Sequence, residues 1–177
     1  MWRVLFSLAA LLVLSVEAHA TDFPELLAGV KAVDVLSDAP SPDAEWCGVS
    51  KDMLRSTAIL VLKKNTTLSI NENASLPFVY VNLTAAKLGE LGLNACAGYL
   101  SVVLDIYEEV KRDDRSVLVV VPVWVRGTVL VYNRGAFANE VKSYVTDYVE
   151  QFSAAWLMQN QSNSASTSPP LTHGSAP

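Results

Sequence analysis

Two consecutive stretches of alternating residues place the strongest constraint on how this chain can fold. In "ACAGYLSVVLDIYEEVK" (Ala95–Lys111), apolar residues recur at every second position, and "SVLVVVPVWVRGTVLVY" (Ser116–Tyr132) follows at once. A period of two is typical of a β-strand with one buried face. The two stretches therefore predict a long antiparallel hairpin that turns at Asp113 and Asp114.

Pairing Lys111 with Ser116 sorts the hairpin into an apolar face and a mixed face. The apolar face would pair Ile106 with Val121, Leu104 with Val123, and Val102 with Val125. The mixed face would pair Tyr107 with Val120, Asp105 with Pro122, Val103 with Trp124, and Ser101 with Arg126. A shift of one residue would mix the faces, so the parity of the strands is well specified. Pro122 lacks an N–H, which predicts an edge position or a bulge there.

The mixed face supplies a candidate interaction surface. Exposed aromatic side chains beside an arginine are typical of protein–protein interfaces. A helix or loop that covers this face is the alternative explanation of its composition. The candidate interaction residues are Tyr99, Asp105, Tyr107, Trp124 and Arg126.

The remaining chain predicts two helices and three further strands. Ser50 is a favourable N-cap for a helix over about 51–64, although "TAILVL" within it could also form a strand. Apolar residues at helical spacing from Phe137 to Trp156 predict a last helix that buries the apolar face of the sheet. The further strands are expected at 26–37, 66–71 and 77–83, with loops at 38–48 and 84–94. The predicted fold class is α+β: a mostly antiparallel sheet of about five strands in the order β-α-β-β-β-β-α, with two helices packed on one face.

This order of elements resembles the small α/β domains of bacterial envelope proteins. Examples are the amino-terminal domain of the Tol-system β-propeller protein and the curli secretion channel family. The segments "WCG" (Trp46–Gly48), "NACAGY" (Asn94–Tyr99) and "VWVRG" (Val123–Gly127) also resemble those of uncharacterised secreted proteobacterial proteins. The resemblance implies a fold and an envelope setting, and it carries no functional residue to this chain.

Both ends of the chain differ in composition from the centre. Arg3, an apolar run over Val4–Leu14 and the ending Ala18-His19-Ala20 predict a signal peptide over residues 1–20; a short membrane anchor is the alternative. The Ser-, Asn- and Pro-rich residues 159–177 predict a disordered tail, or else a tether. One domain over 22–158 remains, and it is expected in the periplasm or outside the cell, with no transmembrane anchor once the signal peptide is cleaved.

The side-chain inventory disfavours several functions. The chain has two histidines, His19 and His173, and both lie outside the expected domain, so a histidine-based catalytic or metal site is not expected there. The net charge is −5 and no basic stripe occurs, which disfavours nucleic-acid binding. Asp105 and Glu109 would lie roughly 13 Å apart along a strand, which is too far for a glycosidase pair. We therefore expect no enzyme, no cofactor and no metal, and keep a carboxylate-dependent enzyme as the least favoured alternative.

Cys47 and Cys96 are the only cysteines in the chain. An exported protein with an even number of cysteines favours a disulfide. Such a bond would close a loop of about 50 residues and contribute roughly 2–4 kcal/mol to stability. Because Cys47 lies just before a predicted helix, a reactive thiol is the alternative.

These observations favour a non-catalytic exported module that binds an unknown protein partner in the cell envelope or outside the cell. An assembly subunit that associates through sheet edges is the alternative, because "VLVVVPV" (Val117–Val123) is uncharged and high in β-propensity. Pro122 would oppose such pairing.

Overall fold

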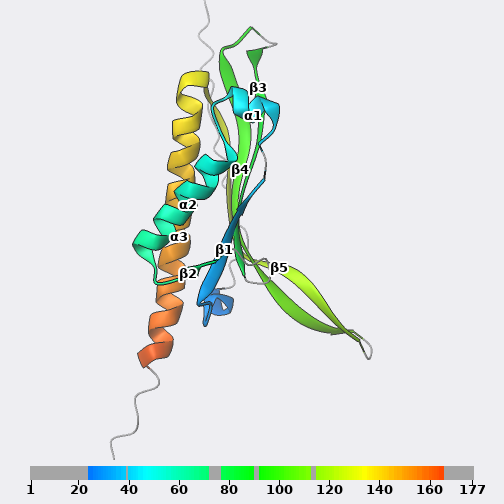
Figure 1. The fold of residues 1–177 in the computed structure, drawn as a ribbon, viewed down its shortest axis with the longest axis vertical. Helices are drawn as coiled ribbons and strands as arrows, with labels where there is room; N and C mark the ends of the chain where they lie inside the picture. Colours follow the sequence, from blue (N-terminus) through cyan, green and yellow to red (C-terminus); the bar gives the residue numbers. More distant parts are fainter. Residues whose placement is uncertain (1–23, 39, 72–76, 90–91, 113–114, 166–177) are drawn as a thin grey trace, which may run out of the picture.

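The computed structural model describes residues 24–38, 40–71, 77–89, 92–112 and 115–165 (Figure 1). The helical elements are η1 (Pro24–Leu27), α1 (Pro42–Trp46), α2 (Lys51–Asn65) and α3 (Arg134–Ala165). The strands are β1 (Ala32–Ser37), β2 (Ser69–Ile70), β3 (Phe78–Lys87), β4 (Ala95–Arg112) and β5 (Arg115–Asn133). None of the helices that the structure describes combines the length and apolar character needed to cross a bilayer.

The five strands form one mixed sheet in the order β2-β1-β3-β4-β5. β1 runs parallel to both β2 and β3, whereas β3, β4 and β5 pair antiparallel. The predicted α+β class and five-stranded sheet are confirmed. β1 lies between β2 and β3 in the sheet. Helix α2 connects β1 to β2 and carries the chain back across the sheet, so that β2 runs parallel to β1.

Several element boundaries differ from the prediction. The segment expected to be one strand over 26–37 begins with η1, and the loop expected over 38–48 contains α1, capped by the Ser41 hydroxyl, which accepts from Ala44 N. The predicted number of two helices is therefore too small. β3 continues to Lys87, because its last residues pair with the start of β4.

The last helix extends through Ala165, although the ordered domain was expected to end at 158. Asn160 anchors the start of this added part: its Oδ1 accepts from Gly29 N at 3.0 Å and its Nδ2 donates to Leu27 O at 3.1 Å. One turn earlier, Trp156 Nε1 donates to Val30 O at 2.8 Å. These bonds hold the end of α3 against η1. The predicted signal peptide over 1–20 and residues 166–177 of the predicted tail lie outside the described residues.

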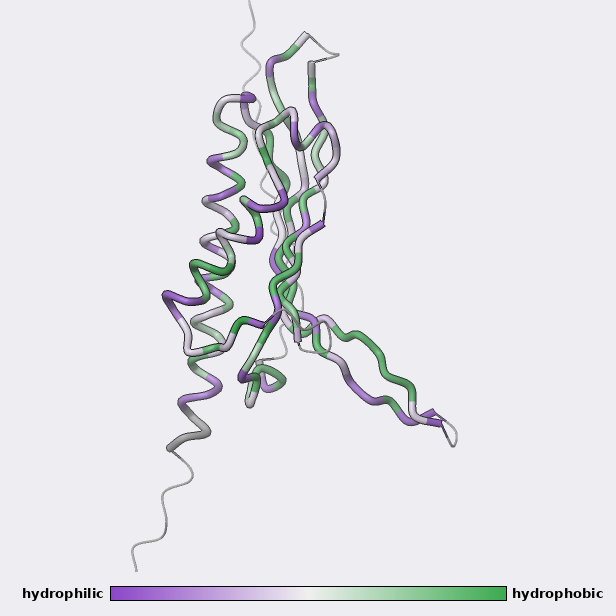
Figure 2. Tube along the Cα trace, in the orientation of Figure 1, coloured by the Kyte–Doolittle hydropathy of each residue, from purple (hydrophilic) through white to green (hydrophobic). Residues whose placement is uncertain are grey.

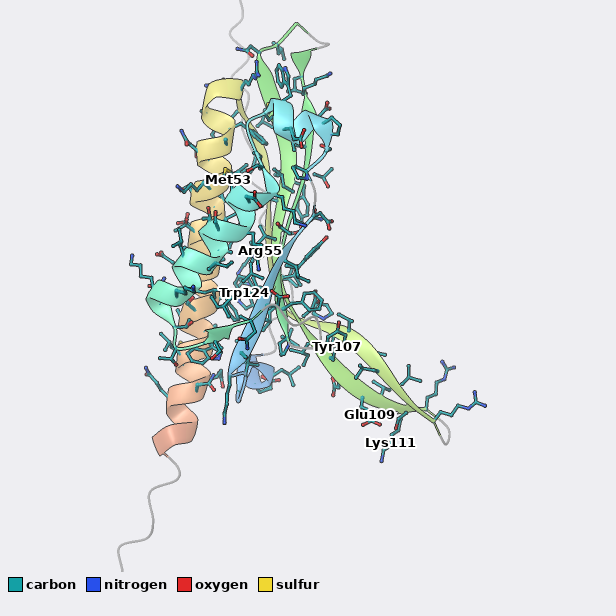
Figure 3. All side chains as sticks on the ribbon, viewed as in Figure 1. Met53, Arg55, Tyr107, Glu109, Lys111 and Trp124 are labelled. Carbon is teal, nitrogen blue, oxygen red and sulfur yellow. A yellow bond between two sulfur atoms is a disulfide. The ribbon has the colours of Figure 1, made fainter. Side chains whose placement is uncertain are left out.

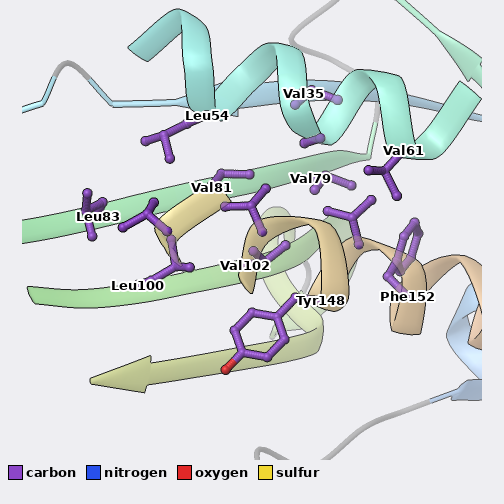
Figure 4. Packing of buried hydrophobic residues seen from close by; sticks show 14 of the residues in the cluster. Val35, Leu54, Val61, Val79, Val81, Leu83, Leu100, Val102, Tyr148 and Phe152 are labelled. Atoms are coloured by element: carbon purple, nitrogen blue, oxygen red, sulfur yellow. The ribbon is translucent and has the colours of Figure 1, made fainter. Parts of the chain in front are cut away.

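The core lies between the sheet and the helices α2 and α3 (Figure 4). Ser50 caps the start of α2, and its hydroxyl accepts from Met53 N. The predicted apolar stripe of α3 is buried, with Tyr144 the half-buried exception. The two helices also contact each other. Buried side chains that Figure 4 shows between these layers include Val35, Leu54, Val79, Val81, Leu100, Val102 and Phe152.

Cys47 and Cys96 form a disulfide, with Cα atoms 6.1 Å apart, and both residues are buried. The bond joins the end of α1 to the start of β4, across 49 positions of sequence. It therefore fixes the loop that precedes α2 against the end of the sheet.

One irregularity in the hairpin changes which side chains share a face. β4 and β5 keep the predicted register from the pair Arg112–Arg115 to the pair Asp105–Pro122, and the next pair is Leu104 with Trp124. Val123 is therefore the extra residue of a β-bulge, directly after Pro122. β5 is also an edge strand. Pro122 therefore lies both on an edge strand and next to a bulge, the two positions that its missing N–H predicts. Beyond the bulge the predicted pairs are wrong by one residue: Leu104, Val103, Val102 and Ser101 lie opposite Trp124, Val125, Arg126 and Gly127.

Candidate interaction surface

The bulge divides the five predicted interaction residues between the two faces of the sheet. Trp124 is 2 % exposed and lies edge-on to Phe152 of α3, with ring centroids 5.6 Å apart. Figure 3 places it between the sheet and the long helix. The expectation that Trp124 shares a face with Tyr107 is wrong, because the extra residue Val123 reverses the parity of β5 from that point on.

Arg126 follows Trp124 to the helix-covered face. Its guanidinium lies 5.0 Å from the Trp124 ring centroid, and its Nε donates to Gln151 Oε1 on α3 at 3.2 Å. Arg126 Nη1 also donates to Val125 O at 2.8 Å. The arginine therefore lies against Trp124 and α3, on the other face of the sheet from Tyr99 and Asp105.

Tyr99, Asp105 and Tyr107 lie on the opposite face of the sheet, together with residues of β3 and β5. We define the open face as the side chains of the three antiparallel strands that point away from α2 and α3. The cross-strand register assigns to it Phe78, Tyr80, Tyr99, Val103, Asp105, Tyr107, Val125, Val129 and Val131, together with the polar residues Asn82, Thr84 and Ser101.

Much of the open face is accessible to solvent. Tyr99 and Tyr107 are 43 % and 37 % exposed, and Val129 and Val131 are 57 % and 56 % exposed. The helices pack on the other side of the sheet, so none of the described helices covers these side chains. Tyr99 and Val129 are direct cross-strand neighbours and Val131 lies two residues along β5, and a cluster of exposed apolar side chains of this kind is typical of an interaction site.

Two contacts on the open face hold its aromatic rings in place. The rings of Phe78 and Tyr107 lie with centroids 6.1 Å apart, across the β3–β4 pair. Tyr99 lies over Gly127, where a β-carbon would come 2.9 Å from Tyr99 Cζ. Gly127 therefore leaves the space that the tyrosine ring occupies.

Two titratable groups on the open face, Tyr80 and Asp105, have altered proton affinities. The Tyr80 hydroxyl donates to Asp38 Oδ2, and this hydrogen bond, followed by burial and by the charges of Asp38 and Asp105, raises the pKa of Tyr80 to about 12. Burial among the neighbouring side chains raises the pKa of Asp105 above its ordinary value. Asp105 is half-buried between Phe78 and Pro122, its cross-strand neighbours.

At one end of the sheet, β4 and β5 continue beyond the other strands as a projecting arm (Figure 1). The last pair between β3 and β4 is Phe78 with Asp105, so the pairing beyond it involves β4 and β5 alone. We define the arm as Ile106–Arg112 of β4 and Arg115–Val121 of β5. The predicted turn residues Asp113 and Asp114 lie outside the described residues.

The structure also contains two shallow clefts that sequence reasoning did not identify. One, of about 420 Å³, lies at the base of the arm between the loop after η1 and the residues Pro77, Ile106 and Tyr107. The other, of about 400 Å³, lies beside the disulfide, where the Arg134 guanidinium stacks 4.3 Å from the Trp46 ring centroid. Within the described ranges, no group of three or more His, Cys, Asp or Glu side chains is placed to hold a metal ion.

Sequence reasoning also missed Phe78 and Tyr80. Their alternation in "PFVYVNL" was visible, but it could not show which face of the sheet they share with Tyr107. That assignment requires the β3–β4 register, which pairs Phe78 with Asp105 and Tyr80 with Val103.

No protein-family model matches the sequence, and a search of curated proteins finds no match. Among solved structures, the chain is similar to a PelC dodecamer from Paraburkholderia phytofirmans, at 13 % identity and a TM-score of 0.40, over 83 % of this chain and 97 % of that chain. It is also similar to a minor lipoprotein from Acinetobacter baumannii, at 13 % identity and a TM-score of 0.31, over 77 % and 95 % of the two chains. Neither is a Tol-system or curli secretion protein, so that resemblance remains a prediction.

Proposed function

We propose that this chain is a non-catalytic exported module of the cell envelope or the extracellular space, and that it acts by binding a protein partner through the open face. The observation that carries the proposal is the exposure of Tyr99, Tyr107, Val129 and Val131 together on one side of the sheet. In a monomeric domain, both sides of such a sheet are usually accounted for: one packs on the core and the other is polar. Here the second side carries exposed tyrosine and valine side chains beside the polar residues Asn82, Thr84, Ser101 and Asp105.

The composition of the open face suits a protein partner. Tyrosine rings present a large contact area at low entropic cost, and they are enriched at the centre of interfaces. The ring contact between Phe78 and Tyr107 and the seat of Tyr99 over Gly127 hold three of these rings before any partner arrives. Preorganisation of this kind reduces the entropy lost on binding.

A photo-crosslinking amino acid placed at Val129 tests the proposal in the intact cell envelope. We expect a discrete adduct with a second protein from this position. Leu60 is the matched control, because it is also an exposed aliphatic residue, at 67 %, but lies on α2. Equal adducts from both positions would contradict the proposal. A Val129→Glu exchange should remove the adduct formed from a crosslinker at Val131, while Leu60→Glu should leave it unchanged.

The exposed arm favours a second candidate function, self-association through a sheet edge. This candidate concerns a different surface from the open face and is developed in the next subsection.

A further inference from the structure

The two strands of the arm differ in charge. The β4 strand carries Glu108, Glu109, Lys111 and Arg112, whereas the β5 strand has no charged residue between Arg115 and Pro122. Figure 2 shows the contrast as one hydrophilic and one hydrophobic strand. Each strand of the arm has one outer edge, because each pairs only with the other there among the described residues.

Charged residues along an edge are a common device against pairing with another strand. The β4 edge of the arm carries such charges. Along the β5 edge, only Arg115 at one end and Pro122 at the other oppose pairing with another strand. Between them, Val117, Leu118 and Val120 are 50 %, 64 % and 50 % exposed. The protection is thus missing along one specific edge, over Val117–Val121.

We propose that two copies of this chain associate through the β5 edges of their arms, antiparallel, about a two-fold axis at Val119. The run Val117–Val121 is aliphatic at every position and can be read in either direction, so it is complementary to itself. In this register Val119 lies opposite Val119 of the second copy, Val117 opposite Val121, and Leu118 opposite Val120. In this register Val117, Val119 and Val121 of both copies lie on one side of the joined arms, and Leu118 and Val120 lie on the other. The same surface of each copy therefore forms the contact, as a two-fold interface requires.

The charge on the pairing strand favours the antiparallel direction. Arg115 is the first residue of β5 and its only charged residue before Pro122. A parallel arrangement in register would place Arg115 beside Arg115 of the second copy. The antiparallel register separates the two Arg115 residues by roughly 27 Å, the length of eight strand residues, and this exceeds the screening length of about 8–10 Å in physiological salt.

Another occupant of this edge fits the structure less well. A lipid bilayer would have to accommodate Glu108 and Glu109 in the middle of the arm, which is costly for an apolar interior. An interface of five residues per copy is smaller than the roughly 20–30 residues per side of a stable complex. We therefore expect a reversible dimer, populated at high protein concentration.

Cysteine substitution tests the register of this dimer. Both native cysteines are held in the disulfide, so an introduced cysteine is the only free thiol. Directly opposed side chains in an antiparallel pair have β-carbons about 4.5–5.5 Å apart, close enough for crosslinking with a short bridge. Under mild oxidation or with a short dithiol-reactive linker, Val119→Cys should form a covalent dimer at least about tenfold faster than Val110→Cys. Val110 is the matched control, because it lies on the β4 strand of the same arm and is 44 % exposed.

A mixing experiment checks the axis. Val117→Cys and Val121→Cys should each crosslink slowly alone and rapidly when the two variants are combined. Equal rates for Val119→Cys and Val110→Cys, or no gain on mixing, would overturn the proposal.

Analytical ultracentrifugation of the purified protein tests the association without a crosslink. We expect a concentration-dependent shift from monomer to dimer, and Val119→Lys should weaken it at least about tenfold, because it places like charges opposite each other. Val110→Lys should leave the dimer intact. A monomer at every concentration, a series of larger oligomers, or flotation of the protein with anionic lipid vesicles that Val119→Lys abolishes would each contradict the two-fold arm dimer. The outcome is independent of the proposed function, which is tested by partner adducts at Val129.

Discussion

The ring of Tyr99 occupies the space above Gly127, so that a β-carbon at Gly127 would lie 2.9 Å from Tyr99 Cζ and 3.1 Å from Leu100 O. Gly127 lies on β5 opposite Ser101, two residues along β4 from Tyr99. The glycine thus decides how a principal aromatic side chain of the open face is oriented.

Gly127→Ala should displace Tyr99 from the sheet and destabilise the fold by about 1–3 kcal/mol, because the added methyl group overpacks a close contact. Chemical unfolding measures the loss, and the nuclear magnetic resonance signals of the Tyr99 ring report its displacement. Gly135→Ala is the control: it lies in the first turn of α3 with no atom closer than 3.6 Å to the added carbon, and it should be neutral or slightly stabilising. Unchanged ring signals in Gly127→Ala would contradict this account of the open face.

Trp124→Ala should destabilise the fold by roughly 3–5 kcal/mol, because the indole is buried against Phe152 and its removal leaves a cavity. The nearby Val129→Ala exchange, on the exposed side of the same strand, should change the free energy of unfolding by less than about 0.5 kcal/mol. Urea unfolding of both variants distinguishes the two faces of β5. Comparable losses would contradict the assignment of Trp124 and Val129 to opposite faces of β5.

Replacing both Cys47 and Cys96 by alanine should lower the free energy of unfolding by about 2–4 kcal/mol, since the bond closes a long loop in the unfolded chain. The check is unfolding with and without a thiol reductant. Wild type should lose this stability on reduction, and the double variant should not respond. A wild-type protein insensitive to full reduction would argue against a structural role for the bond.

The pH dependence of stability should carry a contribution from Asp105. Because burial raises its pKa in the folded state, the native protein binds this proton more tightly than the unfolded chain does. The contribution favours folding below the unfolded pKa of about 3.9, and it is lost as the pH rises through the folded pKa. The unfolding free energy of wild type, relative to that of Asp105→Asn, should therefore decrease as the pH rises from below about 3.9 through the folded pKa of Asp105. Asp147→Asn, at an exposed position on α3, provides the baseline.

Tyr80 should titrate late. The hydrogen bond that it donates to Asp38 disfavours the tyrosinate and raises its pKa to about 12. A spectroscopic titration of tyrosinate absorbance should lose one late-titrating group in Tyr80→Phe. Tyr132 should remain late, because its pKa is also raised to about 12, chiefly by its hydrogen bond with Tyr144. Between pH about 10 and 12, the native protein holds the Tyr80 proton that the unfolded chain releases, so stability should fall as the pH rises through this range.

The sequence alone determined the two long helices, the residues of α3 that are buried, and the hairpin from its turn to Pro122. Helix α2 follows from the Ser50 cap and its apolar spacing, and α3 follows from the stripe that ends at Trp156. The pairing of Lys111 with Ser116 follows from a turn placed at Asp113 and Asp114, and the alternation of the two strands specifies its parity. These features depend on neighbours within one or two turns or on a pattern repeated over many residues, and both are readable in one dimension.

Tertiary structure decided what the pattern could not. The bulge at Val123 moved Trp124 and Arg126 to the helix-covered face, because one unpaired residue reverses the parity of everything that follows it. Asn160 and Trp156 bind the end of the last helix to Leu27 and Val30, more than a hundred residues earlier in the chain. Phe78 joined Tyr107 on the open face only through the register of β3 against β4. Each of these outcomes depends on which distant segments meet, and a sequence pattern specifies the faces of an element without specifying its partner.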